Sequence, residues 1–220
     1  MIRFSLLLLF LGIGAIAHGY EEFQLTRAST AEPVKVELAE IEAGKAPTSS
    51  HVTLGTHWSV YPRSIYTYMR DKGDTSQPVS GTSINHVFYP VISESHPYFK
   101  ALHELEQQFG GIDKIPAEKL PKLDTFSMLI RTDRYSMVYG IPTNWAKETG
   151  PTGLIINDVS PLSDLEIGLL RRSFPKFNAY TVLVLQDGRH PSPYTYIAGM
   201  FVIGPVLMFL ALAVFVRRSR

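Results

Sequence analysis

The sequence IAGMFVIGPVLMFLALAVFV, residues 197–216, carries no charged side chain and is followed by the last four residues of the chain, RRSR. At 1.5 Å per residue, a helix of this length rises about 30 Å, which matches the hydrocarbon core of a bilayer. Clustered arginines resist crossing a membrane. We therefore predict one C-terminal transmembrane helix over residues 197–216 and a cytoplasmic basic tail over residues 217–220.

A second apolar run lies near the start of the chain. Arg3 precedes residues 4–17, which are rich in leucine and end in the small-x-small pattern Ala15-Ile16-Ala17. This order is typical of a secretory signal peptide over residues 1–17, and the run is short for a spanning helix. The alternative is a short N-terminal anchor that stays in the protein. In both cases basic residues keep the two chain ends in the cytoplasm, so the intervening segment is extracytoplasmic.

The exported segment is long enough for one domain with its own core. The chain has 21 basic and 20 acidic residues. Because several of its arginines lie at the two ends, the exported segment is slightly acidic, so we expect no nucleic-acid partner. Cysteine is absent, which excludes disulfides, thiolate metal sites and a cysteine nucleophile. The lack of cysteine and of Asn-x-Ser/Thr acceptor sites favours a bacterial inner membrane.

Hydrophobic periodicity predicts an extended lead-in over residues 18–50 and then an α+β domain over residues 51–190. Pro90 lies within one expected strand and indicates an edge or a bulge there, because proline cannot donate to a strand ladder. The last expected strand is apolar on both faces, which suits a central position. The expected strands span residues 51–55, 64–69, 85–92, 125–132, 154–157 and 180–186, and the expected helices follow Ser95 and Ser160 as N-caps.

Two architectures fit this order of elements. Three strands, a helix and then more strands is the order of an OB-type barrel. A second helix before a central strand fits a generic α+β sandwich equally well. The expected fold class is therefore α+β, with a single extracytoplasmic domain of about five or six strands and two helices, plus the C-terminal membrane span.

Sequence motifs for catalysis are missing. The chain contains no Gly-x-Ser-x-Gly, His-Glu-x-x-His, Gly-x-Gly-x-x-Gly or Walker sequence. The strongest metal candidates are His96 and His103, seven residues apart on one expected helix, with Glu106 after them. Seven residues separate the two histidines by about 10 Å along a helix, so a third element would have to close in to hold one ion. The alternative is polar decoration of an amphipathic helix, and we expect neither a metal nor a cofactor.

Aromatic residues along the first strands form a candidate ligand pocket. The residues that would line it are Trp58, Tyr66, Tyr68 and Tyr89, together with Tyr61 and Phe88. Aromatic residues at strand spacing are also common core residues, so packing is the alternative.

Two functions fit the sequence. The first is a membrane-anchored extracytoplasmic interaction, scaffold or assembly module that acts beside another membrane protein. The second is an envelope enzyme, hydrolase-like, whose histidines and carboxylates are scattered along the chain. A cleft that holds two or more of the histidines with a carboxylate would favour the enzyme. An exposed apolar patch without such a cleft would favour the interaction module.

Overall fold

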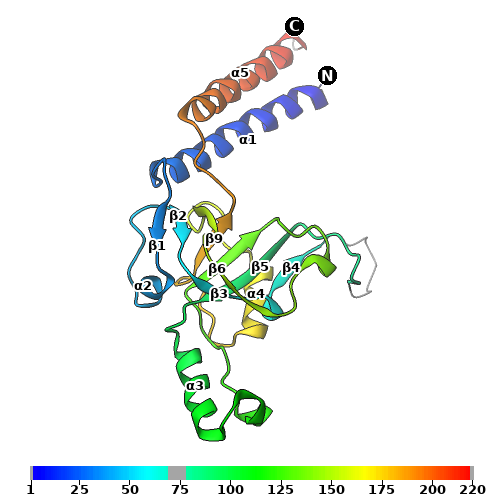
Figure 1. Cartoon of the computed structure of the whole chain (residues 1–220). Coiled ribbons are helices and arrows are strands. Elements are labelled where there is room, and N and C mark those ends of the chain that lie inside the picture. The colour runs from blue at the N-terminus through cyan, green and yellow to red at the C-terminus, as the bar shows by residue number, and fades with distance from the viewer. Residues whose placement is uncertain (1, 69–77, 219–220) are drawn as a thin grey trace. The chain divides into compact units, whose positions relative to one another are not determined.

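The computed structural model describes residues 2–68 and 78–218 and divides into two compact units (Figure 1). The terminal unit combines Met1–Glu32 with His190–Arg220, and the central unit is Pro33–Arg189. The strand expected to reach Met69 ends, within the described residues, at Thr67, and Met69 itself lies outside them.

The terminal unit consists of two long helices, α1 (Ile2–Arg27) and α5 (Tyr194–Arg218). Both are long and apolar enough to cross a membrane. The two helices lie side by side and antiparallel, with the two chain ends at the same end of the pair (Figure 1). Helix α1 includes residues 18–27, for which the sequence predicts an extended lead-in. Glutamate, glutamine, leucine and arginine are good helix formers, and they continue the helix past the apolar run.

The central unit is built on one mixed sheet. Its strand order is β1-β2-β8-β9-β6-β5-β3-β7, with β4 also paired to β5. Strands β1 and β2 are parallel, as are β6 and β9, and the other pairs are antiparallel. The strands are β1 (Val34–Val36), β2 (His51–Leu54), β3 (His57–Val60), β4 (Ile65–Thr67), β5 (His86–Ile92), β6 (Met128–Thr132), β7 (Trp145–Glu148), β8 (Thr152–Ile155) and β9 (Leu183–Asp187).

Three α-helices and four short 3₁₀ turns complete the described part of the central unit. They are α2 (Leu38–Glu42), α3 (Pro97–Phe109) and α4 (Asp164–Ser173), with η1 (Tyr61–Arg63), η2 (Ile112–Lys114), η3 (Ala117–Lys119) and η4 (Val138–Gly140). The fold is therefore α+β, which confirms the expected class. The nine strands of the sheet exceed the five or six expected.

The sheet curls because two strand pairs form one bent ribbon. Strand β2 pairs with β8 and strand β3 pairs with β7, and the register is the same in both pairs. At the bend the Leu54 N–H donates to the Pro151 carbonyl at 3.0 Å, and the Gly150 N–H donates to the Leu54 carbonyl at 2.9 Å. One half of the ribbon lies beside β9 and the other half beside β5, so the ribbon folds the sheet into a half-barrel.

The core lies on the inner face of this curl. Successive side chains along a strand point to opposite faces, so each strand contributes every second residue to the interior. Outside the curl, a cluster of phenylalanines packs near α4: Phe126 contacts Phe174 and Phe177, with ring centroids 4.8 and 5.6 Å away. The inner core includes Val52, Leu54, Tyr61, Val87, Tyr89, Val91, Met128, Ile130 and Leu185, together with Leu38 and Ile41 of α2.

Strand β5 is an interior strand although it contains Pro90. On one side β6 pairs with β5 along residues 87–91. On the other side β4 pairs as far as Phe88, and β3 begins to pair at Val91. The expectation of an edge is therefore wrong. Pro90 lies beside a break between two partner strands, where its missing N–H is tolerated.

The two predicted helices of the central unit form, with later starts than expected. Helix α3 begins after His96, whose ring accepts a hydrogen bond from the Tyr98 N–H, so His96 is the N-cap in place of Ser95. Helix α4 begins after Ser163, which forms a capping box with Glu166, so the expected cap at Ser160 is wrong. The capping box satisfies two backbone N–H donors at once, those of Ser163 and Glu166, which explains the preference for Ser163.

Candidate functional site

Helix α3 is amphipathic, and its apolar side is incompletely covered. It projects from the sheet together with η2 and η3 (Figure 1). The side chains of Phe99, Leu102, Leu105 and Phe109 share one face, yet no residue of α3, all of which the structure describes, is buried. An apolar helix face that stays partly open to solvent is a feature of interaction surfaces.

A groove of about 630 Å³ lies between this apolar face and the outer face of the sheet. The ring of Trp58, on β3, lies 5.5 Å from the ring of Phe99. Ile112, on η2, is 50% exposed at the groove. The apolar lining is Trp58, Phe99, Leu102 and Ile112, and the polar lining is Glu94, Lys100, His103 and Glu106.

Aromatic contacts fix the base of α3 against the sheet. Trp145 of β7 stacks on Tyr98 with ring centroids 5.1 Å apart, and the same Trp145 ring meets Phe99 edge-on at 6.0 Å. An ion pair joins Lys147 of β7 to Glu94, which lines the groove. Rigid aromatic rings lose little entropy on ordering, so α3 is held in one orientation at its first turn.

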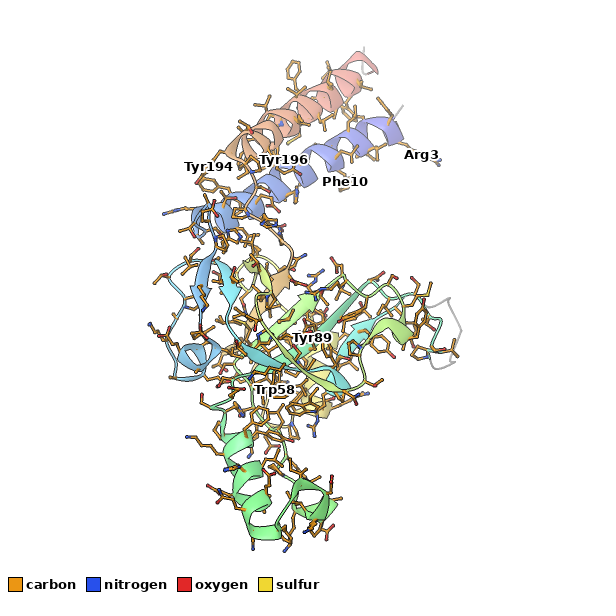
Figure 2. All side chains as sticks on the ribbon, viewed as in Figure 1. Arg3, Phe10, Trp58, Tyr89, Tyr194 and Tyr196 are labelled. Atoms are coloured by element: carbon orange, nitrogen blue, oxygen red, sulfur yellow. The ribbon has the colours of Figure 1, made fainter. Side chains whose placement is uncertain are left out.

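The four aromatic residues predicted to form a pocket lie on opposite faces of the sheet. Trp58 faces outward to α3, whereas Tyr66, Tyr68 and Tyr89 pack in or against the inner core. In Figure 2 Trp58 lies toward α3 and Tyr89 lies within the sheet. The cause is strand alternation, because the pairing of β3 with β5 aligns Ser59, not Trp58, with the inward side of β5.

The predicted metal candidates are also in different environments. His96 is buried, and its Nδ1 accepts a hydrogen bond from the Tyr98 N–H at 3.1 Å. His103 is exposed, 3.5 Å from the carboxylate of Glu106 and 2.9 Å from the amide of Gln107. Within residues 2–68 and 78–218, no three histidine, aspartate or glutamate side chains converge as metal ligands.

His96 lies near a serine and a carboxylate, which are the residue types of a hydrolase triad. The Ser93 N–H donates to one Glu42 carboxylate oxygen at 2.9 Å, and the Ser93 hydroxyl donates to the other. Burial lowers the pKa of His96, and the charge of Glu42 opposes that shift. Because the Ser93 hydroxyl donates to Glu42, its proton points to the carboxylate and not to the imidazole of His96. The arrangement lacks the serine–histidine hydrogen bond that activates a nucleophile.

A polar network lies inside the half-barrel, and no sequence motif predicts it. Ser59 Oγ donates to the Glu148 carboxylate at 2.6 Å, and Tyr61 Oη donates to it at 2.9 Å. Tyr135 Oη donates to Tyr61 Oη at 3.2 Å. Burial raises the pKa of Tyr61 and that of Tyr89, whose rings lie 4.5 Å apart. These bonds satisfy polar groups within the core and tie β3 to β7.

His57 adds a buried imidazole beside this network. It is 0% exposed, its Nδ1 lies 2.9 Å from the Gly55 carbonyl, and its Nε2 has no hydrogen-bond partner among the described residues. Burial lowers the pKa of His57. We expect the free energy of unfolding to fall as pH drops below about 6.5, because the unfolded chain then binds a proton that the native state excludes. Above that pH the contribution is complete.

Denaturant titrations of the intact protein in detergent micelles, followed by tryptophan fluorescence between about pH 7.5 and 5.5, measure this slope. His57→Gln should reduce the slope without removing it, since the pKa of His96 is lowered too. His103→Gln, at an exposed histidine, is the control for the substitution itself. Burial acts to raise the pKa of Glu166, but hydrogen bonds from His86 and Ser163 outweigh it and lower that pKa to about 2, so its effect falls in a separate, more acidic range. An unchanged slope in the His57 variant would contradict the expectation.

Comparisons of the chain with protein-family models, curated proteins and solved structures found no match.

Proposed function

We propose that this protein is an interaction module, anchored in a bacterial inner membrane, that holds its central unit outside the cytoplasm and docks another membrane protein in the groove beside α3. The open apolar groove carries the proposal. Its apolar lining with a polar border has the anatomy of a protein interface, and tryptophan is among the residues that contribute most to binding.

The anchoring helices support a role at the membrane surface. Residues 28–33 separate α1 from β1, and residues 188–193 separate β9 from α5. These connections are short, so the central unit stays at high effective concentration beside membrane partners. Arg3 and the arginines after residue 216 support cytoplasmic chain ends. The absence of cysteine and of glycosylation acceptor sites supports a bacterial envelope.

The arrangement of the histidines gives less support to an envelope hydrolase. Among the described residues, His86 pairs with Glu166 at 3.2 Å, whereas His103 pairs with Glu106 on another element. Neither of these two pairs adjoins a serine hydroxyl that donates to the imidazole, so neither forms a nucleophile–base site.

Replacing an exposed apolar residue of the groove tests the proposal. We expect Ile112→Asp to reduce capture of the membrane partner by about 30-fold or more, because a carboxylate must then be desolvated at the interface. Leu165→Asp is the matched control: Leu165 is also an exposed apolar residue but lies on α4, outside the groove. Quantitative co-purification from membranes solubilised in mild detergent measures capture by each variant against the parent.

Both variants should keep the parent's denaturation midpoint, since both positions are exposed. Equal loss of capture in the two variants, or no loss in Ile112→Asp, would refute the groove as the docking site. Loss of function in complementation after a single change such as His86→Gln, in a folded protein, would favour the enzyme instead.

A further inference from the structure

The facing sides of α1 and α5 are lined by residues at intervals of seven, most of them small. Seven residues bring a helix back to nearly the same face after two turns, so each set forms one straight line of contact. The outward sides of both helices carry large exposed apolar residues such as Phe10 and Phe209. The buried residues at seven-residue intervals are Ser5, Gly12, Gly19 and Thr26 on α1 and Ile197, Gly204 and Ala211 on α5, and Glu22 and Leu25 of α1 are buried beside them.

The two backbones touch at the centre of this line. A Cβ atom added to Gly12 would lie 2.7 Å from the carbonyl oxygen of Gly204, and one added to Gly204 would lie 2.9 Å from the carbonyl oxygen of Gly12. Real Cβ atoms do not approach backbone atoms this closely, so glycine is required at both positions. Close backbone approach through glycine is a principal way in which helices associate inside a membrane.

Side-chain hydrogen bonds join the helix pair at both ends. At one end Ser5 Oγ donates to the Ala211 carbonyl at 2.7 Å. At the other end Thr26 Oγ1 donates to the Ser192 carbonyl at 3.1 Å, and Ser192 Oγ donates to the carboxylate of Glu22 at 2.7 Å. Polar contacts of this kind fix the register of the pair.

We propose that α1 stays in the mature protein as a second membrane-spanning helix, paired with α5, and is not removed after Ala17. A cleaved signal needs an apolar run but no surface that fits another helix. Here most of the large residues of α1 are exposed, whereas Gly12 lies against the α5 backbone, an arrangement that is useful only if the partner helix is present. Cleavage after Ala17 would remove Ser5 and Gly12 and leave the backbone of α5 at Gly204 facing lipid. This topology is independent of what the groove binds.

The mass of the intact chain, purified from membranes through a C-terminal tag, tests retention directly. The expected mass is that of the full chain, 24.6 kDa plus the tag. A mature chain that begins at His18 overturns the proposal.

Cross-linking in native membranes tests the pairing, and the absence of cysteine removes any background. We expect the double variant Ser5→Cys/Ala211→Cys to form an intramolecular disulfide when a mild oxidant is added to the membranes, because the two residues are already in contact through a hydrogen bond. The control pair Ser5→Cys/Phe209→Cys should not, since Phe209 is exposed on the outward side. Equal cross-linking of the two pairs, or none in either, would contradict the pairing.

A third change separates close packing from mere proximity. Gly12→Leu, added to the Ser5→Cys/Ala211→Cys chain, should reduce the cross-linked fraction about tenfold, because the side chain collides with the Gly204 backbone. Gly14→Leu is the matched control on the same helix: a Cβ there meets nothing within 4 Å. If both leucine variants cross-link like the parent, the glycine contact does not hold the helices together.

Discussion

Val184→Asp and Leu185→Asp should each unfold the central unit, although the two side chains point to opposite faces of the sheet. Val184 is 1% exposed and Leu185 is 0% exposed. Strand β9 lies between β8 and β6 and is covered on both faces, as its sequence predicts. An unpaired carboxylate buried on either face costs several kcal/mol, a large share of the roughly 5–15 kcal/mol that stabilises a typical domain.

Near-UV circular dichroism and limited proteolysis of the detergent-solubilised chain measure this loss of packing. Tyr180→Asp is the control, because Tyr180 is 96% exposed just before the strand. Leu183→Asp should have a smaller effect, since Leu183 is only partly buried. If either Val184→Asp or Leu185→Asp keeps the parent spectrum, one face of β9 is open and the half-barrel is wrong.

Gly153→Ala should destabilise the central unit by about 3 kcal/mol or more, a large effect for one methyl group. The added Cβ would lie 2.0 Å from the Gln186 carbonyl oxygen and 2.8 Å from the Gln186 carbonyl carbon. Both atoms belong to the backbone of β9, so a side-chain rotation cannot relieve the clash. Strands β8 and β9 must separate at that point, which weakens the ladder of hydrogen bonds between them.

Gly168→Ala in α4 is the comparison that isolates this effect. A Cβ at Gly168 meets nothing within 4 Å. Alanine is the better helix former, so this variant should gain about 0.5–1 kcal/mol. Urea denaturation of both variants beside the parent gives the two differences. A Gly153→Ala midpoint equal to the parent's would contradict the close approach of β8 to β9 at Gly153.

The sequence predicts the elements whose pattern is self-contained. Strand β5 and helix α3 have clear periodicity, and Gly110, with φ 72°, is the left-handed cap at which α3 ends. Strands β3 and β7 are not predicted, because His57, Lys147 and Glu148 are residue types that are usually exposed. Their pairing depends on contact between segments far apart in the chain, which a local pattern does not encode.

The candidate site is likewise predictable only where it depends on a local pattern. The apolar face of Phe99 and Leu102 follows from helical spacing, and Trp58 is a candidate from its residue type. Two facts need the folded chain: Trp58 faces α3 while Tyr89 faces inward, and Ile112 completes the groove. Strand register and tertiary packing determine both. Gly12 likewise reads as part of a uniform apolar run until Gly204 lies against it.

The pairing of α1 with α5 has a consequence for the folding of a chain that has no cysteine. Short connections join α1 and α5 to the two ends of the central unit, Pro33–Arg189. While they stay paired, the unfolded central unit is a closed loop and not a free chain. Closing a loop of that length removes entropy from the unfolded state worth on the order of 5 kcal/mol in the chain-entropy model. The helix pair thereby acts on folding as a cross-link that no reductant can break.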